Sequence, residues 1–420
     1  MLEKKVLGAV LSLSWALGLV VSSAAHAGPM DGNSGDVMLQ AFHWRSTETY
    51  PWWNIVQGKA SDIKNSGFTM VWLPPSGDSG AKEGYMPRQL YLQSSSYGTD
   101  AQLKSAIGAL RTYGVKAIGD IVINHRVGTS NWADFTNPTW GSWAVVKGDE
   151  WTSATGNYDT GDGFSAARDL DHTNGTVQSD LKSWMGWMKS SIGYDGWRYD
   201  YVKGYAGSYV GAYNTHTVPY FSVGELWTDL NLNDVNPHRQ KIMDWINATG
   251  GKSTAFDFTT KGILQQAVQY NEYWRLKATD GKPQGAIGWW PAKSVTFIDN
   301  HDTGPSSPSG GQNHWPFPSD KVMQGYAYIL THPGIPCVYW VHFYDWGHGA
   351  AIKSLMAARK EKGVTSTSAV SIQVADTTRY AAIITGNTGS LAMKLGPSAW
   401  SPGTGWTLVN SGSNWAVWKK

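Results

Sequence analysis

Three short segments decide the fold of this chain: GWRYD at residues 196–200, FSVGE at 221–225 and VTFIDNHD at 295–302. Each is an apolar, strand-like run that ends in a carboxylate, which is a poor choice of side chain for a protein core. The strands of a parallel β/α barrel all end at one rim, however, and their last side chains point into a single cleft. The three segments therefore predict an α/β protein with a (β/α)8 TIM barrel and an acidic site at the carboxyl ends of its strands.

Apolar runs that alternate with helical stretches support this prediction along the rest of the chain. Eight strands are expected, and their nearly continuous apolar residues suit a sheet that is buried on both faces. The expected strands lie at 37–42, 69–73, 117–123, 196–201, 220–223, 255–258, 294–298 and 335–339, and the clearest helices at 101–111, 177–190 and 321–330.

The connection between the third and fourth expected strands is too long for a simple link. It is rich in Gly, Thr, Asn, Asp and Trp, and we interpret residues 125–170 as a subdomain inserted into a catalytic barrel that covers residues 28–362. After residue 362, apolar residues alternate with Gly, Thr and Ser turns. This pattern predicts a C-terminal antiparallel β-sheet domain over residues 363–420.

The first residues have the pattern of a secretory signal peptide. Two lysines precede an apolar run over residues 6–21, and AHA at 25–27 is a small-residue cleavage site. We therefore expect residues 1–27 to be removed and the protein to be secreted, with no membrane attachment afterwards. A membrane anchor is the alternative, but the run is short and a processing site follows it at once. The single cysteine, Cys337, excludes an internal disulfide.

The composition narrows the classes of partner. A formal net charge of +2 gives no strong field for nucleic acid or an anionic membrane surface, so neither is an expected partner. Tryptophan is unusually frequent, with 24 residues, whereas only 16% of residues are charged. Flat indole rings stack on the faces of sugar rings, so this composition favours carbohydrate. The alternative is that these rings simply fill a large core.

Asp200 and Arg198 lie on the same face of their expected strand, because side chains at i and i+2 of a strand point the same way. A nearby guanidinium lowers the pKa of a carboxyl and keeps it ionised, which suits a nucleophile that attacks an anomeric carbon. A strand-end ion pair without chemistry is the alternative interpretation.

Glu225 and Asp302 complete a set of acids that glycoside hydrolysis would use. The apolar neighbours of Glu225 raise the pKa of its carboxyl, as a general acid requires; the alternative is a solvated acid at a strand end. Asp302 can stabilise positive charge on a sugar ring, and His301 beside it can donate to sugar hydroxyls. Asp299 is interpreted as structural, and a metal site in this cluster is the competing interpretation.

Four segments resemble, in order and spacing, the signature regions of the α-amylase family of glycoside hydrolases. They fall on the third, fourth, fifth and seventh expected strands. They are DIVINH at 120–125, GWRYD at 196–200, VGELW at 223–227 and FIDNHD at 297–302. Further segments resemble the cereal, barley-type α-amylases, and the signal peptide suggests a secreted bacterial member of that group. These segments are EGYMP at 83–87, FDFTTKGIL at 256–264, GWWPAK at 288–293 and the stretch over 315–337.

The resemblance implies a retaining double displacement and a role for each site residue. Asp200 would be the nucleophile, Glu225 the general acid and base, and Asp302 the stabiliser of the transition state. The residues that would hold or stack on the sugar in the cleft are Tyr85, His125, Arg198, Lys203 and His301.

The resemblance also implies a Ca²⁺ ion between the barrel and the inserted subdomain. Calcium prefers oxygen atoms from carboxylates, amides and backbone carbonyls. Asn124 matches the amide ligand of the family and Gly204 the backbone carbonyl, and we expect the acidic ligands at Asp162 and Asp149. The alternative is that these two acids are solvated turn residues.

Two further positions match surface sugar contacts of the cereal enzymes. The adjacent Trp289 and Trp290 match a starch-binding pair outside the cleft, and the alternative is that both rings pack between helices. Tyr380 falls at the position of another surface sugar contact, although the sequence around it differs.

The implied function is endo-hydrolysis of α-1,4-glucosidic bonds in starch, amylose, amylopectin and maltooligosaccharides by a secreted monomer. A maltooligosaccharide-forming exo-amylase is the alternative with the same signature regions, and a transglycosylase would use the same intermediate. A non-catalytic glucan-binding protein is the rival from another class. The presence of all three acids disfavours it.

Overall fold

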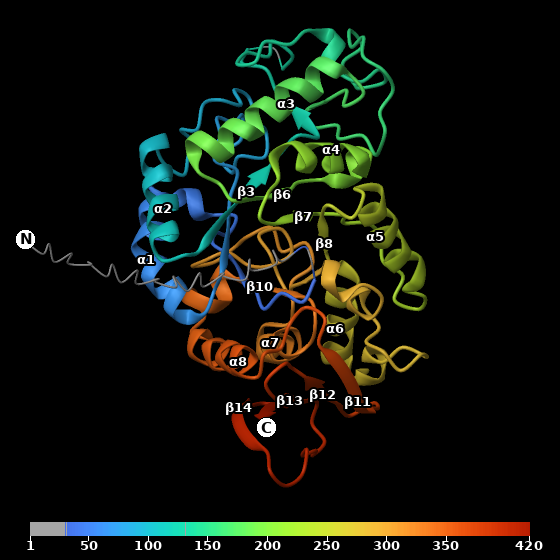
Figure 1. Ribbon diagram of the computed structural model, residues 1–420. Helices are drawn as coiled ribbons and strands as arrows, with labels where there is room; N and C mark the ends of the chain where they lie inside the picture. Colours follow the sequence, from blue (N-terminus) through green and yellow to red (C-terminus); the bar gives the residue numbers. More distant parts are fainter. Residues whose placement is uncertain (1–29, 31, 131) are drawn as a thin grey trace, which may run out of the picture.

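The computed structural model describes residue 30, residues 32–130 and residues 132–420, and its centre is a closed barrel of eight parallel strands (Figure 1). The predicted barrel is therefore confirmed, whereas the predicted signal peptide lies outside the described residues. Around the barrel the strands follow the order β1-β10-β9-β8-β7-β6-β3-β2. They are β1 (Met38–Gln40), β2 (Met70–Leu73), β3 (Lys116–Ile121), β6 (Gly196–Tyr199), β7 (Ser222–Gly224), β8 (Thr254–Phe256), β9 (Ser294–Thr296) and β10 (Ile335–Tyr339).

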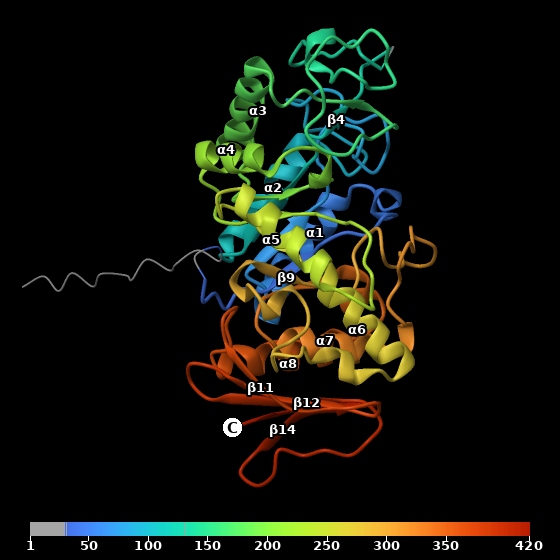
Figure 2. The same ribbon diagram turned by 90° about the vertical axis from the view of Figure 1, so that its right-hand side faces the viewer.

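Eight α-helices are described, and they lie around the strands in both views (Figures 1 and 2). They are α1 (Trp52–Ser66), α2 (Asp100–Thr112), α3 (Gly175–Trp187), α4 (Gly207–Thr217), α5 (Asn236–Ala248), α6 (Phe258–Tyr270), α7 (Val322–Thr331) and α8 (Gly349–Glu361). None of the helices in the described part of the chain is long and apolar enough to cross a bilayer.

The ends of the elements differ from the expected ranges by a few residues, for local reasons. The strand expected at 255–258 ends at Phe256 because the carboxylate of Asp257 accepts the backbone N–H of Thr260 at 2.8 Å and caps α6. The helix expected over 177–190 begins at Gly175, because the side chain of Asn174 caps it.

The segment between β3 and β6 forms a separate lobe at one end of the molecule, opposite the C-terminal sheet (Figure 1). Within it, β4 (His125–Arg126) pairs antiparallel with β5 (Arg168–Asp169), and this register places His125 opposite Asp169. The buried guanidinium of Arg126 donates to the backbone carbonyls of Arg88, Thr136 and Pro138. These bonds tie the start of the lobe to a later segment of the same lobe and to the loop after β2.

The C-terminal residues form a five-stranded antiparallel sheet beside α7 and α8 (Figure 2). Its strands are β11 (Ala369–Ala375), β12 (Tyr380–Thr385), β13 (Ser390–Leu395), β14 (Thr407–Gly412) and β15 (Trp415–Lys419). Tyr380 is fully buried, and its hydroxyl lies 2.8 Å from Nε2 of His332. The prediction that Tyr380 is a surface sugar contact is therefore wrong, because this end of β12 faces α7.

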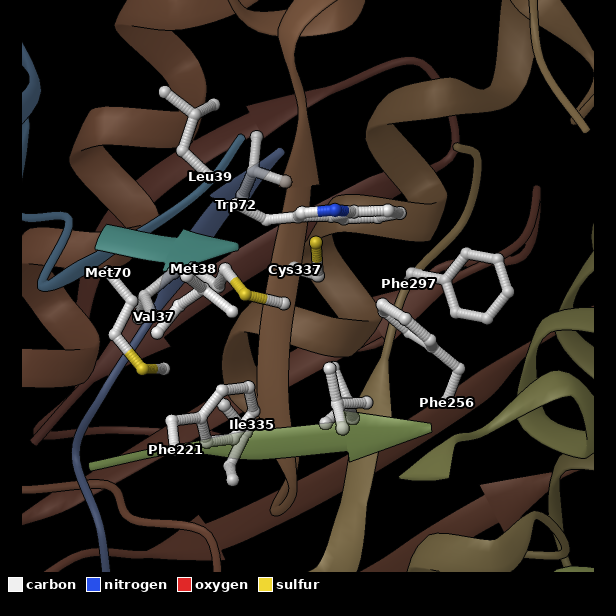
Figure 3. Close-up of a cluster of buried hydrophobic side chains, with 14 of the residues drawn as sticks. Val37, Met38, Leu39, Met70, Trp72, Phe221, Phe256, Phe297, Ile335 and Cys337 are labelled. Carbon is white, nitrogen blue, oxygen red and sulfur yellow. The ribbon is translucent and has the colours of Figure 1, made fainter. Parts of the chain in front are cut away.

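Buried apolar side chains from the strands fill the barrel (Figure 3). Trp72, on β2, connects this core to the polar end of the barrel. Its indole N–H donates to Asp120 Oδ2 at 3.0 Å, and the guanidinium carbon of Arg198 lies 4.9 Å from its ring centroid. The charged groups at the carboxyl ends of the strands therefore rest directly on the packed core.

Candidate active site

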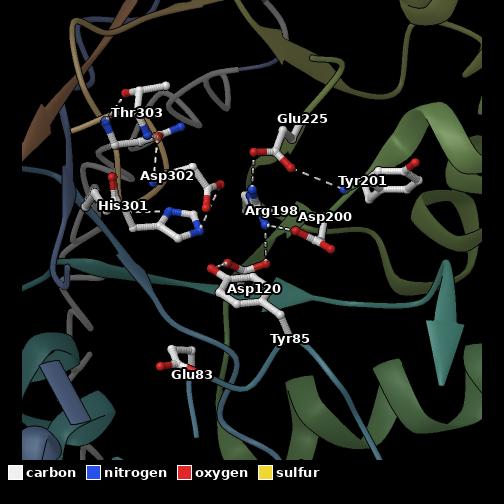
Figure 4. Close-up of polar contacts among 12 residues, drawn as sticks. Glu83, Tyr85, Asp120, Arg198, Asp200, Tyr201, Glu225, His301, Asp302 and Thr303 are labelled. Carbon is white, nitrogen blue, oxygen red and sulfur yellow. Dashed lines mark hydrogen bonds and ion pairs between the residues drawn. The ribbon is translucent and has the colours of Figure 1, made fainter. Parts of the chain in front are cut away.

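A cleft of about 740 Å³ lies at the carboxyl ends of the barrel strands. Asp200 directly follows β6, Glu225 directly follows β7 and Asp302 lies in the turn after β9, and all three side chains line this cleft (Figure 4). The structure thus brings three distant stretches of the chain to one place. The other lining residues are Trp44, Tyr85, His125, Asp162, Phe164, Tyr201, Lys203, Trp227, Thr228, Asp229, Lys241, His301 and His314.

Arg198 contacts three carboxylates with a fully buried side chain (Figure 4). Its Nη1 lies 2.8 Å from Asp120 Oδ1 and 2.7 Å from Asp200 Oδ1, and its Nη2 lies 2.8 Å from Glu225 Oε1. The register of β3 against β6 makes Asp120 the cross-strand partner of Arg198. Arg198 does not line the cleft, and its guanidinium holds the acids. The expected contact of Arg198 with sugar stays a prediction.

Glu225 is in an environment that favours its protonated form. Burial raises the pKa of Glu225 to about 8; the positive charge of Arg198 opposes this rise, and the negative charges of Asp200 and Asp302 add to it. One carboxylate oxygen, Oε2, accepts the backbone N–H of Tyr201 at 3.3 Å, whereas Oε1 has no aligned donor among the described residues. Glu225 is therefore able to hold a proton at neutral pH and give it to a bound group, as a general acid must.

Two backbone features position these acids. Gly224 lets the ring of Trp245 pack directly below Glu225, since a Cβ at residue 224 would lie 2.2 Å from that ring. Tyr201, directly after Asp200, has a left-handed backbone with φ of 46°. This uncommon conformation turns the Tyr201 N–H toward Glu225 and ties the ends of β6 and β7 together.

Asp302 and His301 form the opposite part of the acidic site. His301 Nε2 lies 3.3 Å from Asp302 Oδ2, and the amide nitrogen of Gln40 lies 3.0 Å from His301 Nδ1. Burial raises the pKa of Asp302 to about 7, against the attraction of Arg198 and with the help of Asp200. Burial also holds the pKa of His301 well below its usual value, so this ring is a neutral hydrogen-bonding group.

Three nearly parallel rings line the cleft beside Asp302. The ring centroids of Tyr85 and His301 are 5.1 Å apart with planes 9° apart, and those of Trp44 and Tyr85 are 6.0 Å apart with planes 4° apart. The Tyr85 hydroxyl donates to Asp120 Oδ2 at 2.9 Å, which fixes the ring. Trp44 was not predicted from the sequence. The one feature of the sequence that could have indicated it is its position directly after QAFH at 40–43, close to the end of the first expected strand.

The remaining predicted sugar contacts line the cleft on the side of the inserted lobe. His125 Nε2 lies 2.8 Å from the carbonyl oxygen of Tyr85, and its ring stacks on Phe164 with centroids 4.0 Å apart. Lys203 Nζ lies 5.0 Å from the centroid of the Tyr201 ring. Both polar side chains are therefore placed to reach a ligand in the cleft.

The predicted calcium ligands Asn124 and Gly204 lie together between the barrel and the lobe. A Cβ at Gly204 would lie 1.9 Å from Asn124 Oδ1, so the amide oxygen fills the space that only a glycine leaves. The Asn124 amide nitrogen donates to Asp169 Oδ1 at 3.0 Å. A backbone hydrogen bond from Asp162 to Lys203 O, 2.9 Å long, holds the lobe against the barrel here.

The acidic residues of this region are distributed differently from the prediction. Asp149 uses both carboxylate oxygens: Oδ1 lies 2.9 Å from Arg168 Nη1, and Oδ2 accepts the backbone N–H of Asp169. Asp162 is exposed and lines the catalytic cleft. Asp159 Oδ2, by contrast, is buried without a hydrogen-bond partner among the described residues.

Neither Asp159 nor Asp169 was predicted from the sequence as a ligand. Burial raises the pKa of Asp169 to about 7, and the negative charges of Asp159, Asp149 and Glu150 add to this effect. A divalent cation would offset such a concentration of negative charge. The oxygens of Asn124, Gly204, Asp159 and Asp169 form a donor set of the kind calcium prefers. No sequence pattern separated Asp159 and Asp169 from other loop acids.

At residues 299–302, where a metal site is the competing interpretation, the acidic side chains contact other groups of the protein. Within the described residues, no group of three or more His, Cys, Asp or Glu side chains is placed to hold a metal ion. Asp299 is fully buried, 3.6 Å from Lys261 Nζ, and it accepts the hydroxyl of Thr303 at 3.0 Å. These contacts are consistent with the structural role that we expected for Asp299.

The predicted surface pair, Trp289 and Trp290, does not line the cleft. Trp289 is 40% exposed, and the guanidinium carbon of Arg239 lies 3.8 Å from its ring centroid. Trp290 is partly buried and packs against the core. One indole face is therefore open to solvent, and the other ring anchors the turn that presents it.

A closed parallel barrel with several carboxylates gathered at the carboxyl ends of its strands has the architecture of a glycoside hydrolase. Two family models match this chain: the "Alpha amylase, catalytic domain" at residues 53–219 and the "Alpha-amylase C-terminal beta-sheet domain" at residues 361–419. A protein of Arabidopsis thaliana described as "Probable alpha-amylase 2" is 46% identical over 402 residues, which cover 92% of this chain and 94% of that protein. The chain therefore belongs to the α-amylase family.

Two further comparisons are informative. The "Glucan 1,4-alpha-maltotetraohydrolase" of Roseateles saccharophilus is 33% identical over 394 residues, covering 88% of this chain and 69% of that protein. A solved structure of an Anoxybacillus α-amylase superposes with a TM-score of 0.68 at 16% identity, over 92% of this chain and 97% of that one. The structural likeness supports the barrel and the C-terminal sheet.

Proposed function

We propose that this α-amylase-family enzyme hydrolyses internal α-1,4-glucosidic bonds of starch and related glucans with retention of configuration. The observation that carries the proposal is the contact of one buried guanidinium with both Asp200 and Glu225. Adjacent nitrogen atoms of Arg198 hold the two carboxylates close together. This arrangement favours the separation of about 5 Å found in retaining enzymes over the 6.5–9.5 Å of inverting ones.

The environment of each acid matches its proposed step. Glu225, protonated at neutral pH, gives its proton to the glycosidic oxygen while a carboxylate oxygen of Asp200 attacks the anomeric carbon and the glycosidic bond breaks. In the second step, ionised Glu225 takes a proton from water, which displaces Asp200 from the sugar. Asp302 faces the developing positive charge of the ring, and the parallel rings of Trp44 and Tyr85 offer a stacking surface for the sugar.

Replacement of the nucleophile tests this assignment. Asp200→Asn should lower turnover of soluble starch by roughly 10⁴-fold or more, as for other single catalytic groups. Asp229→Asn is a matched control, because Asp229 lines the same cleft but makes no contact with Arg198. Wild-type-like release of reducing ends by a folded Asp200→Asn variant would contradict the proposal.

Exo-action that forms maltooligosaccharides is the second candidate. It is favoured by the 33% identity to the maltotetraohydrolase over most of this chain. A time course on amylose separates the two: rapid loss of iodine staining relative to reducing ends indicates internal cleavage, and one short product from the start indicates exo-action. We expect the first result.

We further propose that Ca²⁺ binds between the barrel and the inserted lobe, through Asn124, Gly204, Asp159 and Asp169. The ion would supply positive charge among buried carboxylates and hold the lobe that forms one wall of the cleft. Asp169→Asn should weaken calcium affinity more than Glu150→Gln, whose side chain is partly exposed in an ion pair with Arg168. Calcium titration by calorimetry gives a readout that does not depend on activity.

We also propose export with loss of residues 1–27 and a monomeric mature chain. The supports are the N-terminal sequence pattern and a chain with enough buried apolar residues to fold alone. N-terminal sequencing of the protein from culture medium and light scattering would test both. The exposed indole of Trp289 and its neighbour Trp290 are proposed as a starch-binding surface.

A further inference from the structure

A second large groove lies beside the catalytic cleft, on the other side of one loop. It has a volume of about 670 Å³, within the range of roughly 300–1,000 Å³ typical of ligand sites. One wall is the outer face of α6, with Gln266, Gln269 and Tyr270, and the opposite wall is the loop over residues 305–319, with Trp346 at one end.

The lining of this groove contains no charged side chain, in contrast to the cleft. Its exposed surface combines aromatic rings with side-chain amides: Tyr270 is 58% and Trp346 is 36% exposed. The amide nitrogens of Gln266, Gln269 and Asn313 donate to other groups of the protein, whereas their amide oxygens accept no hydrogen bond from the described residues. Such a surface suits a neutral ligand with many hydroxyl groups and an apolar face. It lacks the acids that would cleave one.

The aromatic floor of the groove is fixed before any ligand arrives. The ring of Trp315 lies directly on Gly262 of α6, where a Cβ would come within 2.7 Å of it. Lys261 Nζ lies 4.7 Å from the centroid of this ring and donates to the Trp315 carbonyl at 2.9 Å. Gln265 donates to the carbonyl of Pro316 at 2.8 Å. A ring held in this way loses little freedom when it binds, which favours affinity.

The same loop also forms part of the catalytic cleft. His314 lines the cleft, whereas its neighbours Asn313 and Trp315 line the groove. The backbone N–H of His314 donates to the carbonyl of Asp302 at 3.0 Å, and that of Trp315 donates to Thr303 at 3.2 Å. The two depressions are therefore neighbours that share one wall, and a single polymer molecule is long enough to occupy both.

We propose that this groove binds a second segment of α-glucan without cleaving it. The proposal rests on the proposed function, which supplies a neutral polymer with many hydroxyl groups as the occupant. Binding there increases the local concentration of chain ends and internal bonds near the cleft, so its effect is confined to long substrates.

Calorimetry with maltoheptaose tests the proposal. The parent protein carries Glu225→Gln, which keeps the ligand intact, and Trp289→Ala with Trp290→Ala, which removes the other proposed surface. We expect two binding events in this parent. Adding Tyr270→Ala and Trp346→Ala should weaken the second event by roughly fivefold or more and leave the first unchanged. Tyr158→Ala is the control, because Tyr158 is 70% exposed on the inserted lobe.

Kinetics of the otherwise wild-type enzyme give a second measurement. Tyr270→Ala with Trp346→Ala should raise KM for amylose several-fold and leave kcat, and the hydrolysis of a short chromogenic maltoside, unchanged. The proposal that the groove binds glucan would be wrong if the parent showed a single binding event. It would also be wrong if the groove variant and the control bound maltoheptaose at the second site with equal affinity. If wild-type protein releases no reducing ends and the cleft binds no maltoheptaose, the proposed function itself fails.

Discussion

Replacing Arg198 by methionine tests whether its guanidinium stabilises the buried carboxylates of the site, because it is the cation that contacts several of them. The variant keeps the length and much of the volume of the side chain but removes its charge. Asp120, Asp200 and Glu225 then lose ionic contacts of 2.8, 2.7 and 2.8 Å. Breaking a buried ion pair by removing one partner costs about 3–5 kcal/mol, since the other charge stays buried without compensation.

The loss of stability caused by Arg198→Met should depend on pH, and the pKa values of the carboxyls determine the direction of this dependence. Burial raises the pKa values of Asp120, Asp302 and Glu225 to about 6, 7 and 8, each against the pull of Arg198. Folded-state values above the unfolded ones mean that stability falls as pH rises from the unfolded pKa toward the folded pKa. Without Arg198 the folded-state pKa values of these carboxyls rise further. The stability of the variant therefore continues to fall to a higher pH than that of the wild type. The stability gap to the wild type should widen between about pH 6 and 8.5, by up to about 1.4 kcal/mol per pH unit for each affected carboxyl.

Arg359→Met is the matched control. Arg359 is equally buried, but its guanidinium donates to the backbone carbonyls of Leu330, His332 and Gly334, and burial is the cause of its own lowered pKa. Its loss should cost stability by an amount that is nearly independent of pH in this range. Urea denaturation at several pH values measures both variants, and starch hydrolysis by folded protein measures the site. If the difference in stability between wild type and Arg198→Met did not change with pH, or if the variant kept near wild-type turnover, the proposed role of Arg198 would be refuted.

Three other measurements follow from the site. The pKa of about 8 for Glu225 predicts that kcat/KM falls as pH rises through about 8, since the general acid is then lost; an alkaline limb below pH 6 would contradict it. Asp159→Asn should lower the melting temperature in calcium and reduce the further loss caused by EDTA, and an unchanged response to EDTA would exclude the proposed ligand. Trp289→Ala with Trp290→Ala should weaken adsorption to starch granules but spare soluble maltooligosaccharides, and unchanged adsorption would remove this surface from the proposal.

The barrel was predictable because its strands are buried on both faces and are therefore continuous in apolar residues. All eight expected strands occur, with ends that differ by a few residues from the expected ranges, for example where Asp257 caps α6. Tyr380 was misplaced because an aromatic residue in a strand can face either side. Its sequence neighbours did not show that this side of the sheet meets α7.

Those features of the site that depend on one strand alone were predictable from the sequence. The i, i+2 rule placed Arg198 beside Asp200, but the contacts of Arg198 with Asp120 and Glu225 depend on the register between β3, β6 and β7. Such pairing leaves no local sequence pattern. Trp44 was not predicted because it lies outside the strands, and its stacking on Tyr85 joins two loops that are distant in the sequence.

The excess of carboxylates over cations explains why Glu225 favours its protonated form. Arg198 is fully buried and its single positive charge faces Asp120, Asp200 and Glu225, with Asp302 close by. One cation cannot neutralise four acids, so the protein retains protons on those for which burial outweighs the attraction. The partition is unequal: Asp200 shares Nη1 in a hydrogen bond of 2.7 Å, whereas Glu225 Oε1 lies near Nη2 without hydrogen-bond alignment. In the proposed mechanism, this difference suits the better-bonded Asp200 to act as the nucleophile and Glu225 to give its proton to the leaving oxygen.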